Sequence, residues 1–351
     1  MEGRGHGRAA ARGADHARHR RGRPARGAAA HHRVAPRGGA VRPGRARDER
    51  GFALVVVLLV LALVSVVAAE FSFSMRLEAA AVQAYKSGIT AGHLAETAVA
   101  QAIREIVGDS AWVGLDERGL LTFYTQAGVP LPHLPREQVE FTGGRYSYRI
   151  SDEEGRINLN TAPPERVDRL LLTLGVDKGA RDTIVDSLQD WRDANEAYRL
   201  NGAESEDTYL RLAVPYRSRN ADLESVTELL QVKGVTRALF QGAADRPALV
   251  DQVTVKTEGR VNINTAGPVV LQALGLSDAE ISQIVGTRRG APFSTVPGQF
   301  AGRGLAASTR TFRIDAEGIV DGRVGARLTA IVVKVAGAPP AVRVVEWSGL
   351  R

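Results

Sequence analysis

Residues 49–71 read ERGFALVVVLLVLALVSVVAAEF, and the rest of the chain is organised around this stretch. Among the eighteen residues 52–69, Ser65 is the only one with a polar side chain. At about 1.5 Å rise per residue, a helix of this length reaches roughly 27 Å, close to the hydrocarbon thickness of a bilayer. The stretch is therefore either a membrane anchor or a targeting signal.

The net positive charge of the chain comes from its first fifty residues. Residues 1–50 contain fourteen arginines, no lysine and four acids, a local net charge of +10, whereas the whole chain is +7. Residues 51–351 therefore carry −3, which argues against nucleic acid as a partner of the folded part. The Arg/Gly/Ala/His-rich composition predicts a disordered leader. An RNA-binding tail and a start codon assigned too early are the other interpretations.

The composition also limits the chemistry. The chain has no cysteine, so disulfides and thiolate sites are excluded. Outside the leader the only histidines are His93 and His133, far apart in the sequence, and no Gly-rich phosphate loop follows a predicted strand. We therefore expect that the protein is not an enzyme.

A second helical pattern follows the apolar stretch without a break. No proline occurs from residue 70 to about 107, and apolar residues recur at spacings of three and four, typical of an amphipathic helix. We expect one helix over residues 52–107, with 52–70 in the membrane and the second half packed on a globular head. Gly108 and Asp109 are expected to end it. The apolar positions of the second half are Val82, Tyr85, Ile89, Ala95, Val99, Ala102, Ile103 and Ile106.

The junction at residue 51 resembles the leader of type IV prepilins, with a basic stretch, Gly51, Phe52 and then a long apolar helix. The resemblance implies that a prepilin peptidase cuts after Gly51 and methylates the new amino group of Phe52. Most pilins have glutamate at the fifth mature position, where this chain has Val56. The class that lacks it is the large minor pseudopilin of type II secretion, the general secretion pathway protein K family. An ordinary signal peptide, cut after residues 67–69, is the alternative.

An internal repeat lies further along the chain. Residues 154–164, EGRINLNTAPP, return at 258–268 as EGRVNINTAGP, with eight of eleven positions identical. Each copy predicts a short extended entry and then a helix that is capped by Thr161 or Thr265 and has proline in its first turn. Residues 225–236, SVTELLQVKGVT, predict a helix that ends at a glycine and a second helix that starts at Thr236.

The first repeat also resembles the helix-hairpin-helix modules of DNA-binding competence proteins, in which a hairpin presents backbone N–H groups to a phosphate. The two hairpins of this chain contain Asp177 and Asp278, and an acid repels a phosphate. For that reason we favour a packing or docking domain. A membrane-anchored DNA-binding protein of competence type is the alternative function.

The predicted strands lie on both sides of the repeats. Residues 139–151 predict a hairpin that turns at Gly143-Gly144, and residues 311–320 and 324–335 predict a second one that turns at Asp321-Gly322, with 342–347 as a further strand.

The resemblance to the protein K family extends from residue 50 almost to the C-terminus. Its further motifs are DWRDANEAYRLNGAESEDTYL (190–210), VPYRSRNADLESVTELLQVKGVT (214–236) and FRIDAEGIVDGRVGARLTAIVV (312–333). It implies an α+β fold, in which a pilin-like long N-terminal helix packs on a small antiparallel sheet and a large helical domain of SAM or helix-hairpin-helix type is inserted. The expected domains are the cleaved leader 1–51, the helix 52–107, a pilin-like β region 108–157, the helical insertion 158–300 and the C-terminal strands 301–351.

Residues 190–207 gather hard oxygen side chains, a set that calcium prefers. The family resemblance implies calcium sites in the helical domain, and the spacing favours Asp193, Asn195, Glu204 and Asp207 as ligands. The family usually has aspartate at the position of Asn195, so the charge of the site is lower here. A solvated acidic loop is the alternative. A glycosidase pair of acids is not supported, because these acids lie in one loop without a sign of a groove.

The resemblance implies a minor pseudopilin of the type II secretion system. It would lie at the tip of the periplasmic pseudopilus and help to initiate its assembly for export across the outer membrane. The implied partners are other minor and major pseudopilins, the prepilin peptidase and the inner-membrane secretion platform. The implied location is the inner membrane, crossed once, with a periplasmic C-terminal body.

Overall fold

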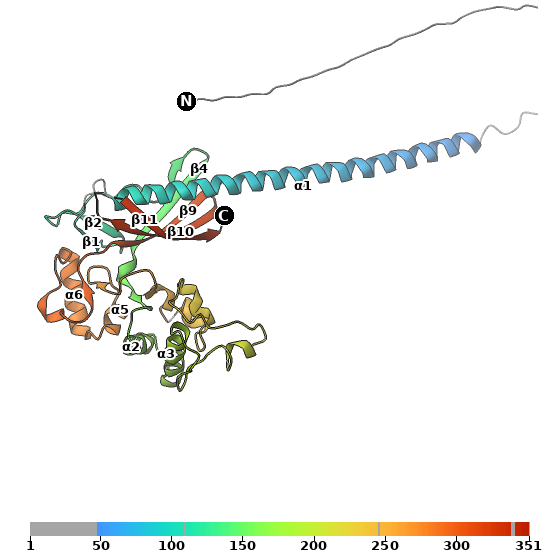
Figure 1. Cartoon of the computed structure of the whole chain (residues 1–351). Coiled ribbons are helices and arrows are strands. Elements are labelled where there is room, and N and C mark those ends of the chain that lie inside the picture. The colour runs from blue at the N-terminus through green and yellow to red at the C-terminus, as the bar shows by residue number, and fades with distance from the viewer. Residues whose placement is uncertain (1–47, 109, 245, 338–340, 351) are drawn as a thin grey trace, which may run out of the picture. The chain divides into compact units, whose positions relative to one another are not determined.

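The computed structural model describes residues 48–337, apart from residues 109 and 245, and residues 341–350. Most of the predicted leader, residues 1–47, and the predicted stop at Asp109 lie outside the described residues. The chain divides into two compact units, Met1–Phe71 and Ser72–Arg351. Helix α1 (Asp48–Ile106), 59 residues long, begins in the first and ends in the second (Figure 1), which confirms the prediction of one helix of more than fifty residues.

The described part of the first unit is the beginning of α1. Its side chains from residue 51 to 71 are all exposed. A window of eighteen residues in this helix reaches a mean hydropathy of 3.2, so by length and composition the helix can cross a membrane.

A five-stranded antiparallel sheet forms the base of the second unit, in the order β11-β10-β9-β4-β3. Both predicted hairpins and the predicted last strand are confirmed. Asp321 and Gly322 both have positive φ angles, 52° and 73°, as the tight turn between β9 and β10 requires. The strands are β3 (Val139–Phe141), β4 (Gly144–Asp152), β9 (Thr311–Val320), β10 (Arg323–Val335) and β11 (Ala341–Leu350), and a separate hairpin consists of β1 (Trp112–Leu115) and β2 (Leu121–Tyr124).

The last part of α1 packs on this sheet. Its small residues Ala91, Ala95 and Ala98 are fully buried and share one core with the sheet. The helix approaches so closely that a Cβ added to Gly318 would clash with the carbonyl oxygen of Ala91. The prediction that the whole second half packs on the head is wrong for three positions, because Val82, Tyr85 and Ile89 are exposed and the packed face begins at Ala91.

A buried ion pair fixes the end of α1. Arg136 donates from Nη2 and Nε to the two carboxylate oxygens of Glu105, at 2.6 and 3.1 Å, and the Tyr148 hydroxyl donates to Glu105 Oε2 at 3.0 Å. Burial and the Glu105 charge raise the pKa of Tyr148. The phenol therefore remains a donor to this carboxylate.

The helical insertion leaves the sheet after β4 and returns before β9. Its core is separate from that of the sheet and extends from Ile157 to Ala307. Two short parallel pairs, β5 with β6 and β7 with β8, tie its segments together. The elements are β5 (Ile157–Asn158), α2 (Pro164–Thr173), α3 (Lys178–Arg192), α4 (Arg237–Gln241), β6 (Val253–Thr254), β7 (Val261–Asn262), α5 (Pro268–Ala273), α6 (Asp278–Gly290) and β8 (Leu305–Ala306), with single 3-10 turns at Glu153–Gly155, Tyr209–Arg211, Val226–Gln231, Leu249–Asp251 and Gly298–Phe300.

The two sequence repeats have equivalent structures. The last asparagine of each N-x-N turn bonds the backbone of a later segment: Asn160 Oδ1 accepts from Leu223 N at 2.9 Å, and Asn264 Oδ1 accepts from Phe293 N at 2.7 Å. The middle carbonyl of each turn accepts from an arginine near the end of the second helix, Leu159 from Arg192 and Ile263 from Arg288. The repeat is therefore a duplicated structural unit as well as a duplicated phrase.

The two copies of the repeat also pack on each other reciprocally. An added Cβ at Gly155 in the first copy would press against Thr265 in the second, and one at Gly259 in the second would clash with Thr161 in the first. The predicted caps are consequently wrong. The N-cap residues are Pro163 and Gly267, without side-chain caps, and the threonines lie at the contact between the copies. The prolines in the first turns and the start at Thr236, which caps α4, are confirmed.

Three consecutive acids join the sheet to the insertion. Asp152 accepts from Asn262 Nδ2, Thr265 Oγ1 and Thr309 Oγ1 at 2.6–2.7 Å. Glu153, fully buried, accepts from Arg313 of β9 and from Thr254 of β6. Glu154 accepts from the backbone N–H groups of Arg310 and Thr311. These carboxylates thus bond the exit from the sheet to the return into it.

Asp152 should make stability depend on pH. Its burial raises the pKa of its carboxyl to about 6, although three side-chain donors oppose the shift. Because the folded-state pKa exceeds the unfolded value near 4, the folded state binds the proton more tightly. This contribution, about 3 kcal/mol, should be present below pH 4 and lost as the pH rises to about 6. Urea unfolding of the full chain in dodecyl maltoside micelles should therefore show a pH-dependent difference between the wild type and Asp152→Asn.

Asp315→Asn is the matched control, because Asp315 is exposed on β9 and its carboxylate accepts from the Thr329 hydroxyl of the neighbouring strand β10. That variant should parallel the wild type at all pH values. An equally parallel curve for Asp152→Asn would contradict the prediction.

Candidate functional site

The predicted processing site, Gly51 and Phe52, lies in the first turns of α1. Phe52 is 73% exposed. An added Cβ at Gly51 would meet no atom within 4 Å, and its φ angle is not positive. Neither packing nor backbone conformation within the described chain therefore requires glycine here, although glycine in a helix is unfavourable by about 1 kcal/mol relative to alanine.

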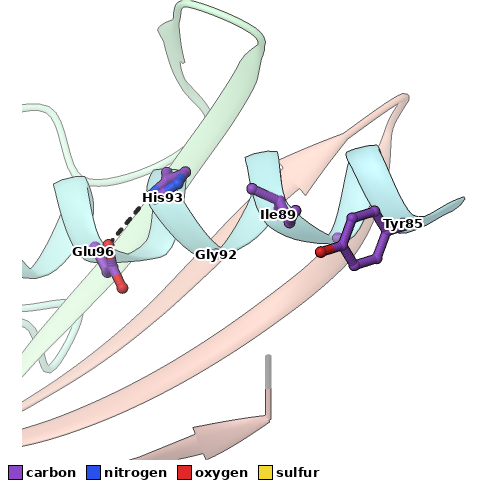
Figure 2. Close-up of a pocket in the computed structure, with 6 residues that line it drawn as sticks. Tyr85, Ile89, Gly92, His93 and Glu96 are labelled. Carbon is purple, nitrogen blue, oxygen red and sulfur yellow. Dashed lines mark hydrogen bonds and ion pairs between the residues drawn. The ribbon is translucent and has the colours of Figure 1, made fainter. Parts of the chain in front are cut away.

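A small apolar surface lies on α1 just before its packed part. We call Tyr85, Gly88, Ile89 and Gly92 the α1 patch. Figure 2 shows Tyr85 and Ile89 projecting from the helix beside the bare turn at Gly92, with His93 and Glu96 further along. The hollow that these residues line has a volume of about 360 Å³. Tyr85 is 71% and Ile89 45% exposed, so the described part of the chain leaves these two side chains uncovered, while Gly88 is partly buried and Gly92 is buried.

The helical hairpins bear on the nucleic-acid alternative. Asp177 caps α3 and accepts from Ala180 N at 3.1 Å, while Ser277 and Glu280 form a capping box at the start of α6. Two acidic side chains thus lie at the helix N-termini that a phosphate would have to approach. The arrangement disfavours phosphate binding at either hairpin.

The acidic loop, residues 190–207, contains the four predicted calcium ligands. Asp193 Oδ1 accepts from the backbone and side-chain nitrogens of Asn195, at 3.2 and 2.7 Å. Asn195 Oδ1 in turn accepts from Ala197 N, and Asp207 Oδ1 accepts from Glu204 N. Asn195 and Asp207 therefore use their oxygens to shape the loop, and of the other predicted ligands it is Asp193 whose charge raises the pKa of Glu204.

Glu204 is the most unusual carboxylate of the loop. Its side chain is 1% exposed, Oε2 accepts from Ser218 Oγ at 2.7 Å, and Oε1 has no hydrogen-bond donor within the described residues. Burial raises the pKa of Glu204, the bond from Ser218 lowers it, and the charges of Glu196, Asp190 and Asp193 raise it further. A buried carboxylate oxygen without a donor is a strong candidate to face a cation.

Two neighbouring residues were missed by sequence reasoning. Asn220 donates to Glu196 Oε1 at 3.0 Å and keeps a buried Oδ1 that lacks a donor among the described residues. Arg199 Nη1 contacts Asp190 Oδ1 at 2.6 Å and Asp193 Oδ2 at 2.7 Å. Asn220 is distant in sequence, so no local spacing indicates it, whereas a cation inside an acidic loop was a visible signal for Arg199.

A hard cation fits part of this donor set. As the side chains lie, no three acidic or histidine residues of the described chain converge tightly enough to hold a metal ion. Glu204 Oε1 and Asn220 Oδ1 are nevertheless buried acceptors without donors, and both neighbour the Glu196 carboxylate. Glu204 is the predicted ligand that this geometry supports best, whereas the two oxygens of Asp193 already accept from Asn195 and Arg199.

Comparison with known proteins gives consistent results. Residues 150–245 match the family model of type II secretion system (T2SS), protein K. The chain is 29% identical over 245 residues to type II secretion system protein K of Pseudomonas aeruginosa, covering 65% of this chain and 68% of the relative. It is 26% identical to a putative protein K of Escherichia coli K12, covering 62% and 66%, and 25% identical to that of Aeromonas hydrophila, covering 82% and 94%. The chain thus spans about two thirds of the length of the Pseudomonas aeruginosa and Escherichia coli K12 relatives.

A solved structure supports the fold. One chain from the crystal structure of the GspK-GspI-GspJ complex of the enterotoxigenic Escherichia coli type 2 secretion system aligns with a TM-score of 0.57 at 16% identity, covering 78% of this chain and 99% of that one. The long helix on an antiparallel sheet with additional helices is accordingly a pilin-like α+β fold. The chain is therefore similar to type II secretion system protein K, over residues 150–245 in the family model and over 62–82% of its length in these relatives.

Proposed function

We propose that this chain is a non-enzymatic minor pseudopilin of the type II secretion system, anchored in the inner membrane by one helix with its body in the periplasm. It would lie at the tip of the periplasmic pseudopilus and help to initiate its assembly. The observation that carries this proposal is α1: it is apolar on all sides over residues 52–69 and leaves Tyr85 and Ile89 of the α1 patch exposed. Such a helix can exchange lipid for the helices of neighbouring subunits.

Two glycines support a helix partner at the α1 patch. Gly88 and Gly92 are four residues apart, and an added Cβ at either would meet no atom within 4 Å in this chain. Each glycine in a helix interior is less favourable than alanine by about 1 kcal/mol. Small residues at this spacing allow a second helix to approach closely. We infer that other pseudopilins, in the manner of the GspI and GspJ chains named with the solved relative, cover the patch.

The missing acid supports the position at the tip. A glutamate at the fifth mature position would pair with the amino terminus of a neighbour, and Val56 cannot do so. The large insertion between β4 and β9 also adds bulk to the head. A subunit of this kind would accept neighbours on one side only. The prepilin peptidase and the inner-membrane secretion platform remain the further proposed partners.

Cross-linking from the α1 patch tests the assembly. Since the chain has no cysteine, Ile89→Cys provides a single attachment point for benzophenone maleimide in cells that express the complete secretion system. Irradiation should give cross-linked products that contain other pseudopilins, identified by mass spectrometry.

Arg118→Cys, in the exposed turn between β1 and β2, is the matched control and should give markedly fewer such products. Equal yields from both positions, or products at residue 89 without any pseudopilin, would contradict the proposed packing.

The amino terminus of the exported chain tests the processing route. We expect intact-mass analysis of protein from a host with its own prepilin peptidase to give a chain that starts at N-methyl-Phe52. Within the described residues no contact requires glycine at position 51, so Gly51→Val should fold but stay uncut. A wild-type terminus at Glu70 would instead indicate an ordinary signal peptide and would overturn the pilin-like anchor.

We also propose that the acidic loop binds calcium, with Asp193, Asn195, Glu204 and Asp207 as the ligand set. The buried, donor-free Glu204 Oε1 supports this most directly. A bound divalent cation would supply the positive charge that the carboxylates of this loop share.

Calorimetric titration of the full chain in dodecyl maltoside micelles with calcium chloride should give a binding isotherm. Glu204→Gln should remove it, because the amide loses the charge that calcium requires. Asp182→Asn, which affects an exposed acid paired with Lys178 on α3, should leave it unchanged. If the wild type gives neither heat nor a thermal shift, the calcium proposal fails.

A further inference from the structure

Arg199 lies where the negative charges of the acidic loop meet. Its Nη1 is within 2.7 Å of both Asp190 Oδ1 and Asp193 Oδ2, and its backbone N–H points at the Asp190 carboxylate, 3.1 Å from Oδ2. No other lysine or arginine occurs between residues 193 and 210. The guanidinium therefore supplies the positive charge that is paired with these two aspartates.

The two aspartates depend on Arg199 to different degrees. Asp190 is fully buried, yet it also accepts from the backbone nitrogens of Arg199 and Ala203. Asp193 is 25% exposed, and Arg199 is the one cation that contacts it within the described chain. If the guanidinium left, Asp190 would keep two donors, whereas Asp193 Oδ2 would be available to another cation.

Arg199 also has a path to leave. Its side chain is 41% exposed, so rotation into solvent requires no movement of the buried core. The charges of Asp190 and Asp193 also act on Glu204, whose Oε1 is buried and has no donor among the described residues. Arg199 thus neutralises Asp190 and Asp193 but leaves Glu204 uncompensated.

We propose that Arg199 is the built-in counter-ion of the acidic loop, and that it gives up Asp193 when a divalent cation binds between Asp193 and Glu204. This inference rests on the proposed calcium site and deepens it. The loop is folded without metal, and the cation must compete with a guanidinium that is already in place. Arg199 consequently lowers the affinity for the cation and becomes more exposed when the cation is bound.

The first test compares Arg199→Gln with the wild type, as full chains in dodecyl maltoside micelles. In EDTA the variant should melt about 5 °C lower, because Asp190 and Asp193 lose their counter-ion. Calcium chloride should restore the loss and should bind the variant at least about tenfold more tightly, since a competing positive charge is gone. Arg217→Gln is the matched control: Arg217 forms an exposed pair with Glu206 nearby and should change neither quantity.

The second test uses the wild-type chain, so that it does not depend on the folding of a variant. Phenylglyoxal modifies exposed guanidinium groups, and peptide mass spectrometry reports the reaction at each arginine. Arg199 should react severalfold faster in calcium chloride than in EDTA, while Arg217 should react at one rate in both.

The outcomes separate the two claims. Calcium binding with no change in Arg199 labelling, or an Arg199→Gln variant with wild-type melting in EDTA and wild-type affinity, overturns the role of Arg199 and leaves the calcium site standing. An absence of calcium binding in the wild type and in a folded Arg199→Gln variant overturns both. A less stable variant that calcium restores, together with faster labelling of wild-type Arg199 in calcium, supports both.

Discussion

The carboxylates of Asp152, Glu153 and Glu154 are the constraint on which the second unit depends. They follow directly after β4, where the chain leaves the sheet, and they bond residues that the chain reaches 100 to 160 positions later. One of them contacts the second repeat, one contacts β9, and one contacts the backbone that leads back into β9. Each acid is buried or partly buried and has charged or polar donors, which is the condition for burying a carboxylate. An insertion of about 150 residues can thereby interrupt a sheet without separating its strands.

Local patterns were sufficient to predict much of the fold. The apolar stretch 52–69, the turn at Asp321-Gly322 and the prolines at the starts of α2 and α5 are signals whose physical causes act within a few residues. The threonines at 161 and 265 misled for the same reason. Threonine before a helix favours a cap locally, but here the two copies of the repeat contact each other and use the threonines for that contact. A long-range contact overrode a local preference, and nothing near either threonine indicates it.

The candidate site residues also differ in whether neighbouring residues or distant ones determine them. The prediction of a processing site at Gly51 and Phe52 rests on adjacent residues. The arrangement of the acidic loop instead depends on Asn220 and Ser218, which lie outside it. Composition predicts a cation site but does not reveal that Arg199 already bridges two of the acids. Periodicity likewise predicts an apolar face on α1 without stating where the head ends, so Tyr85 and Ile89 were placed in the core although no part of the described chain covers them.

The close approach of Ala91 to Gly318 has a mechanical consequence. At this point the helix backbone and the strand backbone are in direct contact, without side chains between them, and both are rigid elements. A force along the axis of α1 would therefore load the sheet in shear, across a contact that cannot tilt or compress as a layer of long side chains can. The five strands share that load through their ladder hydrogen bonds. If a subunit is pulled from a membrane by its N-terminal helix, such a stiff contact would transmit the force from the helix to the head without deforming.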